Sequence, residues 1–328
     1  MAYPVALCDK DTYFYQGIEL AVKTINAGGG VLGKTLNTLV RNDRKDANVA
    51  MMIAETFYEQ GITAVVGHWD ADICYFVQDV YEKNEVVMLT PDASDINLFE
   101  DDYRYVYRMI PNNRVFAETL AKYMGGEGLG RVVICYDDNK YGADFAEILE
   151  NETAKRGIAV VDRVTSVTPS NIKTLTNRWQ AFGCDAVVMA VDFPGVIEPI
   201  KLIHDVYGQI PIFGADNFDR ITFFDALGRY TDSLYMAGYR MEDLEPDFLN
   251  AFRAAYGHDP DLHSIIGYES VYLLKDAIEA TGSTNGSAIA GYLSALKDYK
   301  AIAGIFSYNP ETRGFDGSNV AVWNLGRK

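Results

Sequence analysis

Basic residues are scarce in this chain. Its 328 residues include 29 lysines and arginines against 46 aspartates and glutamates, which gives a formal net charge of -17. Such an acidic chain repels phosphate backbones and anionic lipid headgroups, so we expect neither a nucleic-acid partner nor binding to a membrane surface. Long apolar runs are also missing, because no stretch approaches the roughly 18 to 20 residues of a membrane-spanning helix. We therefore expect no membrane insertion.

The sequence also lacks the short motifs of metal sites and of common catalytic centres. Its histidines show no HExxH or other tight ligand spacing; they are His68, His204, His258 and His263. Surface or hydrogen-bonded histidines are therefore a better interpretation than a metal site. No GxSxG motif and no local Ser or Cys nucleophile signature occurs. We expect no metal, no cofactor and no catalysis, although a triad assembled from distant residues leaves no local signature.

Cysteines and targeting signals are scarce as well. Cys8, Cys74, Cys135 and Cys184 stand singly in apolar surroundings with no CxxC spacing. We interpret them as buried free thiols, with a Cys8–Cys74 disulfide as the alternative. The first residues lead directly into an apolar run and carry no targeting signal. A cytoplasmic protein and the mature part of an exported protein both fit this absence.

The hydrophobic pattern predicts two α/β lobes. Hydrophobic residues make up 48% of the chain, and its length exceeds the size at which a single core usually keeps growing. Strand and helix patterns alternate in one series and then restart in a second. Such alternation is typical of doubly wound parallel sheets. No Gly/Ser-rich or Pro-rich linker separates the series, so we expect short crossings that permit a hinge and enclose a ligand-binding cleft.

The predicted elements can be given by residue range. The first series has strands at 4–7, 36–40, 63–67, 86–90 and 105–109, and helices at 15–27, 47–60 and 71–84. The second series has helices at 114–124, 143–156, 172–182 and 196–207, and strands at 131–136, 159–164, 186–191, 210–214 and 233–239. Helices at 247–256, 263–281 and 287–296 and a β-rich tail at 304–323 complete the chain.

One glycine-rich segment matches a nucleotide-binding pattern. The residues from Gly28 to Thr35 fit the phosphate-loop motif GxxxxGK(S/T) letter for letter. That motif cradles phosphates only when a strand precedes the loop and a helix follows it, because the helix N-terminus supplies the amides. Here a helix pattern precedes the glycines and a strand pattern follows them. We therefore predict a helix C-terminus and a turn, and no nucleotide site.

Polar and aromatic side chains follow the predicted strands, at the end where open α/β sheets bind ligands. In the first lobe they are Trp69, Asp70, Asp72, Asp92, Ala93 and Ser94; in the second they are residues 137–141, Asp192, Phe193, Asp216 and Asn217. Any single aspartate could instead be a helix cap, so the argument depends on the set. Aromatic faces beside carboxylates, with few basic residues nearby, favour a small molecule that carries a positively charged nitrogen.

Several segments resemble one protein family. The run from Gly17 to Gly33, with Ile25-Asn26-Ala27-Gly28 at its centre, resembles the start of type I periplasmic binding proteins of the leucine/isoleucine/valine-binding branch. The similarity covers essentially the whole chain, with further matches at 65–68, 89–91, 107–108, 136–142, 211–214 and 267–270. The resemblance implies a receptor, periplasmic or extracellular, that captures a small amino acid or related amine for an ABC importer and delivers it to membrane permease subunits.

The resemblance also implies how the chain is divided. It places three crossings near Asn112, Arg240 and Gly304. The N-terminal lobe would comprise residues 1–112 and 241–304, and the C-terminal lobe would comprise residues 113–240 and 305–328. Two alternatives remain for the function: a ligand that is an amide, a polyamine or an aromatic compound, and a sensory or regulatory module of the same fold.

For the first lobe, the resemblance implies contacts to a ligand carboxylate. Hydroxyls and backbone amides hold this group in amino-acid-binding relatives, at positions that fall here on Ala71, Asp92, Ala93 and Ser94. Ala71 replaces the usual serine, whereas Ser94 keeps its hydroxyl. Asp70, Asp72 and Asp92 add negative charge close to where the carboxylate would lie. This departure from the family pattern argues against a standard α-amino acid as the ligand.

For the second lobe, the resemblance implies contacts to the amine half of the ligand. Tyr141 corresponds to the tyrosine that faces the ligand in relatives, and Asp216 corresponds to the acid that pairs with its ammonium group. Asn113 stands where relatives often place an aspartate. With Trp69 of the first lobe, Tyr141 is expected to form an aromatic wall of the site.

Overall fold

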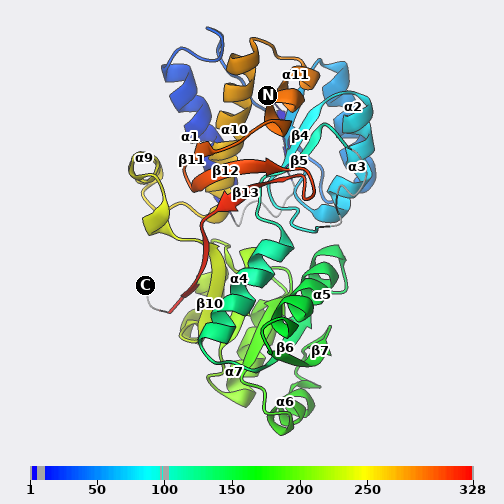
Figure 1. Cartoon of the computed structure of the whole chain (residues 1–328), viewed down its shortest axis with the longest axis vertical. Helices are drawn as coiled ribbons and strands as arrows, with labels where there is room; N and C mark the ends of the chain where they lie inside the picture. Colours follow the sequence, from blue (N-terminus) through cyan, green and yellow to red (C-terminus); the bar gives the residue numbers. More distant parts are fainter. Residues whose placement is uncertain (1, 6–11, 97, 99–102, 327–328) are drawn as a thin grey trace. The chain divides into compact units, whose positions relative to one another are not determined.

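The protein is composed of two compact units. The computed structural model describes residues 2–5, 12–96, 98 and 103–326 (Figure 1). Unit 1 comprises Met1–Asn112 and Met241–Asn319, and unit 2 comprises Asn113–Arg240 and Val320–Lys328. The chain therefore passes from one unit to the other three times.

Unit 1 contains a sheet that is parallel in its middle and antiparallel at one edge. In the described residues its strand order is β11-β12-β13-β5-β4-β3-β1-β2. The strands are β1 (Ala2–Val5), β2 (Leu39–Asn42), β3 (Ala64–Val66), β4 (Val87–Thr90), β5 (Val106–Arg108), β11 (Tyr299–Ala301), β12 (Gly304–Asn309) and β13 (Gly314–Ser318). Strands β1 to β5 run parallel to one another, whereas β12 pairs with both β11 and β13 in antiparallel fashion.

The helices of unit 1 bury one apolar face each. They are α1 (Phe14–Ala27), α2 (Ala47–Glu59), α3 (Ala71–Lys83), α9 (Pro246–Tyr256), α10 (Leu262–Thr281) and α11 (Gly286–Ser294). Helix α2 illustrates why the sequence forms them. It buries Ala50, Ile53, Ala54 and Phe57, at the spacing that puts side chains on one helix face. The Asp46 carboxylate caps its first turn by accepting hydrogen bonds from two backbone N–H groups.

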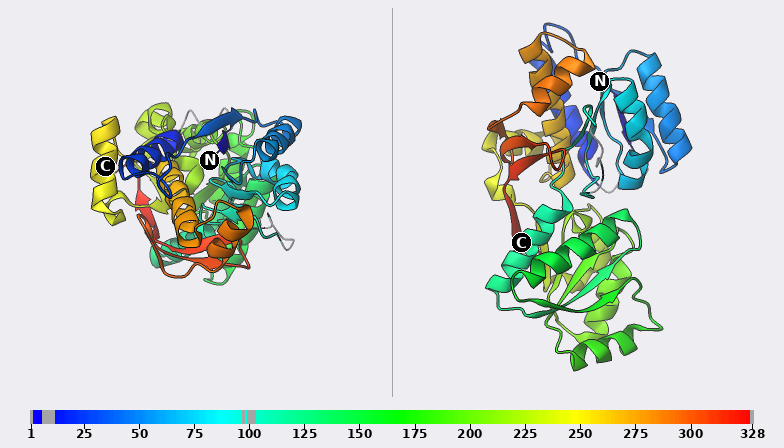
Figure 2. Two further views of the ribbon diagram at one scale, coloured as in Figure 1. Left: turned by 90° about the horizontal axis from the view of Figure 1, so that it is seen from above. Right: turned by 45° about the vertical axis from the view of Figure 1, so that its right-hand side comes forward.

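Helices α1 and α10 lie side by side although they are far apart in the sequence (Figures 1 and 2). Their backbones can approach closely because two facing residues lack side chains. A Cβ atom on Gly17 would lie 1.9 Å from the carbonyl oxygen of Ser264, and one on Gly267 would lie 2.6 Å from that of Phe14. This contact fixes the first turn of α10 next to the N-terminal part of α1.

Unit 2 is a doubly wound sheet with one antiparallel edge. In the described residues its strand order is β14-β10-β9-β8-β6-β7, and only the β14–β10 pair among them is antiparallel. The strands are β6 (Arg131–Tyr136), β7 (Ala159–Val164), β8 (Ala186–Ala190), β9 (Ile212–Gly214), β10 (Leu234–Tyr239) and β14 (Val320–Asn324). Its α-helices are α4 (Asn113–Gly126), α5 (Lys140–Ala154), α6 (Ile172–Ala181), α7 (Ile197–Tyr207) and α8 (Phe223–Leu227). Strand β8 is buried along its whole length, as a central parallel strand should be.

The predicted fold class, two doubly wound α/β lobes, is confirmed. The segment 305–319 differs from the prediction, which assigned it to the C-terminal lobe. It forms β12 and β13 in unit 1 because Gly314 of β13 pairs with Arg108 of β5, so the last crossing follows Asn319. The glycine-rich segment agrees with the prediction: α1 ends at Ala27, and turns lead from it toward β2. The phosphate-loop match therefore lacks the helix start that a phosphate would need.

Two features are absent from the described part of the chain. No helix there is long and apolar enough to cross a membrane. No group of three or more His, Cys, Asp or Glu side chains there could hold a metal ion. Cys74, Cys135 and Cys184 are buried free thiols, whereas Cys8 of the alternative disulfide lies outside the described residues.

Glu269 of α10 links this helix to the antiparallel edge of the sheet. Its carboxylate accepts a hydrogen bond from the backbone N–H of Ile302, in the turn between β11 and β12. Burial raises the pKa of Glu269 to about 8, although the backbone N–H groups around it oppose the shift. The folded chain therefore holds a proton on this carboxyl group at pH values where the unfolded chain has lost it.

Replacing Glu269 with Gln is expected to change how stability depends on pH. The unfolded pKa is about 4.3, so ionisation of Glu269 penalises folding increasingly from that pH up to about 8. We expect Glu269→Gln to raise the free energy of unfolding by up to about 5 kcal/mol at pH 9 and to change it little at pH 4. Urea unfolding at both pH values measures this, with Glu279→Gln at the exposed end of the same helix as control. Identical pH profiles for Glu269→Gln and the unaltered chain would contradict the assignment.

Candidate functional site

The residues predicted for the first lobe lie at the carboxyl ends of two neighbouring strands of unit 1. Strands β3 and β4 pair in parallel register from Ala64 to Val66. Trp69 to Ala71 follow β3, and Asp92 to Ser94 follow β4. These two loops are called the unit-1 edge below. Because parallel strands bring their carboxyl ends to the same side of the sheet, the two predicted groups belong to one surface region.

A histidine from α10 joins the unit-1 edge. The His263 side chain is fully buried, and its Nε2 lies 2.6 Å from Oδ1 of Asp92. The Trp69 ring packs over His263 with centroids 4.8 Å apart, and the Phe14 ring meets Trp69 edge-on at 5.4 Å. Asp92 itself is 12% exposed. The Trp69 ring therefore packs on a histidine that pairs with Asp92, a contact that was not predicted, and the role of Trp69 as an aromatic wall for a ligand remains a prediction.

The position of His263 follows from the start of α10. Asp261 is the N-cap, and it forms a capping box with Ser264 in which each side chain bonds the other residue's backbone. His263 lies in this first turn, and the packing of α10 on α1 holds the turn in place. The interaction joins residues 171 positions apart in the sequence. No local pattern around His263 signals such a partner.

Asp70 is the second acidic side chain of the unit-1 edge. Its Oδ1 lies 2.9 Å from Nζ of Lys45, which is half-exposed. Burial raises the pKa of Asp70, the Lys45 charge lowers it, and the carboxylates of Asp92 and Asp43 raise it further. Asp70 and Asp92 are therefore close enough to repel each other. Its Oδ2 is buried and has no hydrogen-bond partner among the described residues.

The loop after β4 is held by a buried arginine. Arg108 of β5 is fully buried, and its guanidinium donates to the carbonyl oxygens of Ala93 (2.8 Å), Thr312 (2.5 Å) and Asp95. The Ala93 N–H in turn donates a long hydrogen bond of 3.4 Å to Oγ1 of Thr90. Arg108 therefore fixes the backbone of this loop and has its donors directed at carbonyl groups.

The hydroxyl group of Ser94 is buried without a hydrogen-bond partner among the described residues. The residue is only 2% exposed, and its Oγ has no hydrogen-bond partner among the described residues. Burying a hydroxyl without a partner costs about 1–3 kcal/mol, so such groups are rare unless a water or ligand completes them. Among the residues predicted for the first lobe, Ser94 has the clearest sign of an external partner.

A chain of hydrogen-bonded, buried polar groups anchors the loop after β3. His68 is fully buried, with Nδ1 2.7 Å from Oδ2 of Asp43 and Nε2 3.0 Å from the Tyr81 hydroxyl. The Thr90 hydroxyl donates to the His68 carbonyl at 2.8 Å. Burial would raise the pKa of Asp43, but the hydrogen bond and charge of His68 bring it below its usual value. This chain ties the loops after β3 and β4 to each other.

The residues predicted for the second lobe have varied environments in unit 2. Asn113, the first residue of α4, is fully buried; its Nδ2 donates to Oδ2 of Asp144 at 2.5 Å, and its Oδ1 has no partner among the described residues. Tyr141 lies in the first turn of α5, half-buried beside the Phe145 ring. Asp216 is buried and begins a short 3-10 helix, Asp216–Phe218. These side chains are placed in unit 2 as isolated features, and their ligand roles remain predictions.

Asp192 and Phe193 have evident structural roles. The Asp192 N–H donates to Oδ2 of Asp137 at 2.7 Å, and its Oδ2 accepts from Nδ2 of Asn139 at 2.9 Å. These bonds tie the loop after β8 to the loop after β6. Phe193 packs against the hydrophobic core of unit 2. A ligand role for either residue would have to be added to these contacts, so it remains a prediction.

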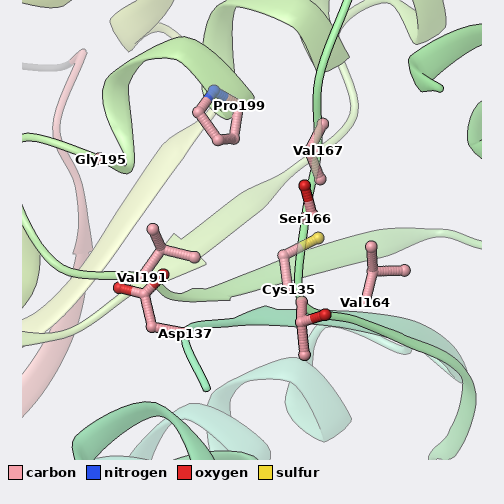
Figure 3. A pocket seen from close by; sticks show the side chains of 9 residues that line it. Cys135, Asp137, Val164, Ser166, Val167, Val191, Gly195 and Pro199 are labelled. Carbon is pink, nitrogen blue, oxygen red and sulfur yellow. The ribbon is translucent and has the colours of Figure 1, made fainter. Parts of the chain in front are cut away.

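Unit 2 has a cavity of about 180 Å³ at the carboxyl ends of β6, β7 and β8 (Figure 3). Its lining residues are Cys135, Asp137, Val164, Thr165, Ser166, Val167, Val191, Gly195 and Pro199. Of the residues predicted for the second lobe, Asp137 lines this cavity, and Val191 of the lining directly precedes Asp192. The predicted residues follow β6, β8 and β9, and none of them follows β7. The same strand-end rule, applied to β7, would have indicated residues 164–167.

The chain was compared with known proteins. A family model described as "Periplasmic binding protein" matches residues 12–325. A Leu/Ile/Val-binding protein homolog 3 from Brucella melitensis is 25% identical over 88% of this chain and 78% of its own length. The leucine-specific-binding protein of Salmonella typhimurium is 27% identical over the same shares. An ABC transporter substrate-binding protein from Desulfitobacterium hafniense, solved in complex with Leu, is 28% identical with a TM-score of 0.89, over 100% of this chain and 98% of that one.

Proposed function

Since the chain belongs to the type I periplasmic binding protein family, in its leucine/isoleucine/valine-binding branch, we propose that it is the solute-binding receptor of an ABC importer. It captures a small amino acid or a related amine outside the cytoplasm, changes no covalent bond in it, and delivers it to membrane permease subunits. Support comes from the extent of the family match, which includes both units, and from a relative of similar fold that was solved with Leu.

The observation that carries this proposal is the buried Ser94 hydroxyl without a hydrogen-bond partner in the described residues. It lies at the carboxyl end of a parallel sheet, where α/β proteins bind ligands. Two loops are tied together around it by Arg108 and His68. A site whose own groups are fixed before binding loses little conformational freedom when the ligand arrives, which favours tight binding.

We assign ligand contacts in both units. In unit 1 the proposed contacts are Trp69, Asp70, Ala71, Asp92, Ala93 and Ser94. In unit 2 they are Asn113, Tyr141, Asp192, Phe193 and Asp216. Trp69 and Tyr141 supply aromatic walls, Asp216 pairs with an ammonium group, and Ser94 bonds the polar end of the ligand. A second candidate ligand class, an amide, polyamine or aromatic compound, is favoured by the two carboxylates of the unit-1 edge.

Thermal unfolding of protein stripped of ligand by unfolding and refolding tests the proposal. Amino acids, amines, amides and aromatic acids are added singly, because a ligand that binds only the folded state raises the unfolding midpoint. At 100 times its Kd the added stability is about 2.7 kcal/mol. We expect members of the amino acid, amine or amide groups to raise the midpoint. A midpoint that none of these compounds changes would overturn the proposed ligand class.

A further inference from the structure

The unit-1 edge has an electrostatic character of its own. The Asp92 carboxylate lies close enough to Asp70 to contribute to the raised pKa of Asp70. Asp92 is held by the buried His263, whose ring packs against the Trp69 ring. Its placement is therefore determined by three segments of the chain: the loop after β4, the loop after β3 and the start of α10. A side chain fixed in this way keeps its charge at one location when a ligand arrives.

The basic groups described around this edge already have acceptors. Lys45 pairs with Asp70 at 2.9 Å, and His263 pairs with Asp92 at 2.6 Å. The Arg108 guanidinium donates to carbonyl oxygens of the chain. A ligand carboxylate placed here would compete with these acceptors and would also be repelled by Asp70 and Asp92. An amide or ammonium group would instead donate hydrogen bonds to them.

The Ser94 hydroxyl does not restore a preference for carboxylates. It is buried and has no partner in the described residues, so it is available to a ligand. A hydroxyl can donate to an oxygen or accept from an N–H group, and it carries no charge. The charged groups around Ser94 therefore determine whether the unit-1 edge favours a ligand carboxylate or a ligand N–H group.

We propose that the Asp92–His263 pair is a specificity determinant of the binding site, and that it selects ligands that present an N–H group, amide or amine, to unit 1 over ligands that present a free carboxylate. This inference rests on the proposed function and narrows its ligand class. It predicts that carboxamides of small amino acids, or the corresponding decarboxylated amines, bind more tightly than the amino acids themselves. His263 acts as a positioning residue that holds the Asp92 carboxylate toward the ligand.

Matched sets of compounds test this inference in the full chain. Leucine, leucinamide and isopentylamine share one side chain and differ in the group that replaces or retains the carboxylate. Isothermal titration calorimetry is expected to give a Kd for leucinamide or the amine at least about tenfold below that of leucine, because like charges at short distance repel strongly in a partly buried site. The same comparison with valine and its derivatives shows whether the preference depends on the side chain.

The variant Asp92→Asn tests the residue itself. It retains the shape and a hydrogen-bond acceptor but removes the charge, so the preference for the amide over leucine should fall at least about tenfold. Glu59→Gln, at an exposed acid at the end of α2, is the control for the same change in net charge and should keep the preference. If Asp92→Asn fails to fold, Asp92→Ser provides a second test of the same expectation.

The outcomes separate the inference from the function it rests on. If leucine binds the unaltered chain as tightly as leucinamide and the amine, the inference is overturned and the receptor function stands. The same conclusion follows if Asp92→Asn and Glu59→Gln shift the preference equally. If neither these sets nor any other amino acid, amine or amide binds, the proposed ligand class fails as well. A fall of at least about tenfold in the preference of Asp92→Asn, absent from Glu59→Gln, supports the inference.

Discussion

Asp216→Asn should reduce the affinity for an amine-bearing ligand by about 2–5 kcal/mol, the usual cost of removing one partner from a buried charge pair. Asp216 is buried at the end of β9, at the start of the helix Asp216–Phe218. An ammonium group that reaches it loses its hydration and needs a carboxylate in return. Isothermal titration calorimetry with the tightest ligand from the thermal screen measures the loss, which corresponds to roughly 30-fold or more in Kd.

The loop around Asp216 has a support besides the Asp216 carboxylate. Asn217 braces the loop by donating to the carbonyl oxygens of Met189 and Val191 and by accepting from the Ala215 N–H. Asp225→Asn, an exposed acid of α8, is the matched control for net charge and should bind like the unaltered chain. Unchanged affinity in Asp216→Asn would show that Asp216 is not the ammonium partner.

The sequence was informative about which loops could bind a ligand. Alternating strand and helix patterns predict parallel sheets, and parallel sheets place their carboxyl ends on one side. Trp69, Asp92 and Ser94 follow from this rule without knowledge of the tertiary structure. The rejection of the phosphate-loop match at Gly28 to Thr35 depended on element order in the same way, and the structure confirms that order.

What the sequence did not reveal depends on contacts between distant segments. His263 reaches Asp92 only because α10 packs on α1 through Gly17 and Gly267. The sequence after Gly304 predicts β-structure with a turn. Such a pattern does not determine which sheet the strands join, so β12 and β13 were assigned to the wrong unit. The burial of Arg108 could not be predicted from the sequence either, since arginines are usually exposed.

The position of Arg108 predicts that its loss strongly destabilises unit 1. Its guanidinium joins three backbone carbonyl oxygens, from the loop after β4 and from the turn between β12 and β13. Its own backbone N–H donates to the carbonyl of Arg313 at 2.7 Å. The side chain thus holds the β12–β13 turn and the loop after β4 against β5. Hydrogen bonds to a charged donor contribute about 1.5–3 kcal/mol each, and they are lost together when it is removed.

We therefore expect Arg108→Met to lower the free energy of unfolding by about 3–5 kcal/mol, because the apolar replacement leaves buried carbonyl groups without donors. Arg108→Lys keeps the charge but not the planar set of donors, so its loss should be about half as large. Urea unfolding followed by circular dichroism measures both, and Arg104→Met, whose side chain is exposed, is the control on the same segment. A loss below about 1 kcal/mol in Arg108→Met would mean that these carbonyl groups find other donors, and that the loop carrying Ala93 and Ser94 is not fixed by Arg108.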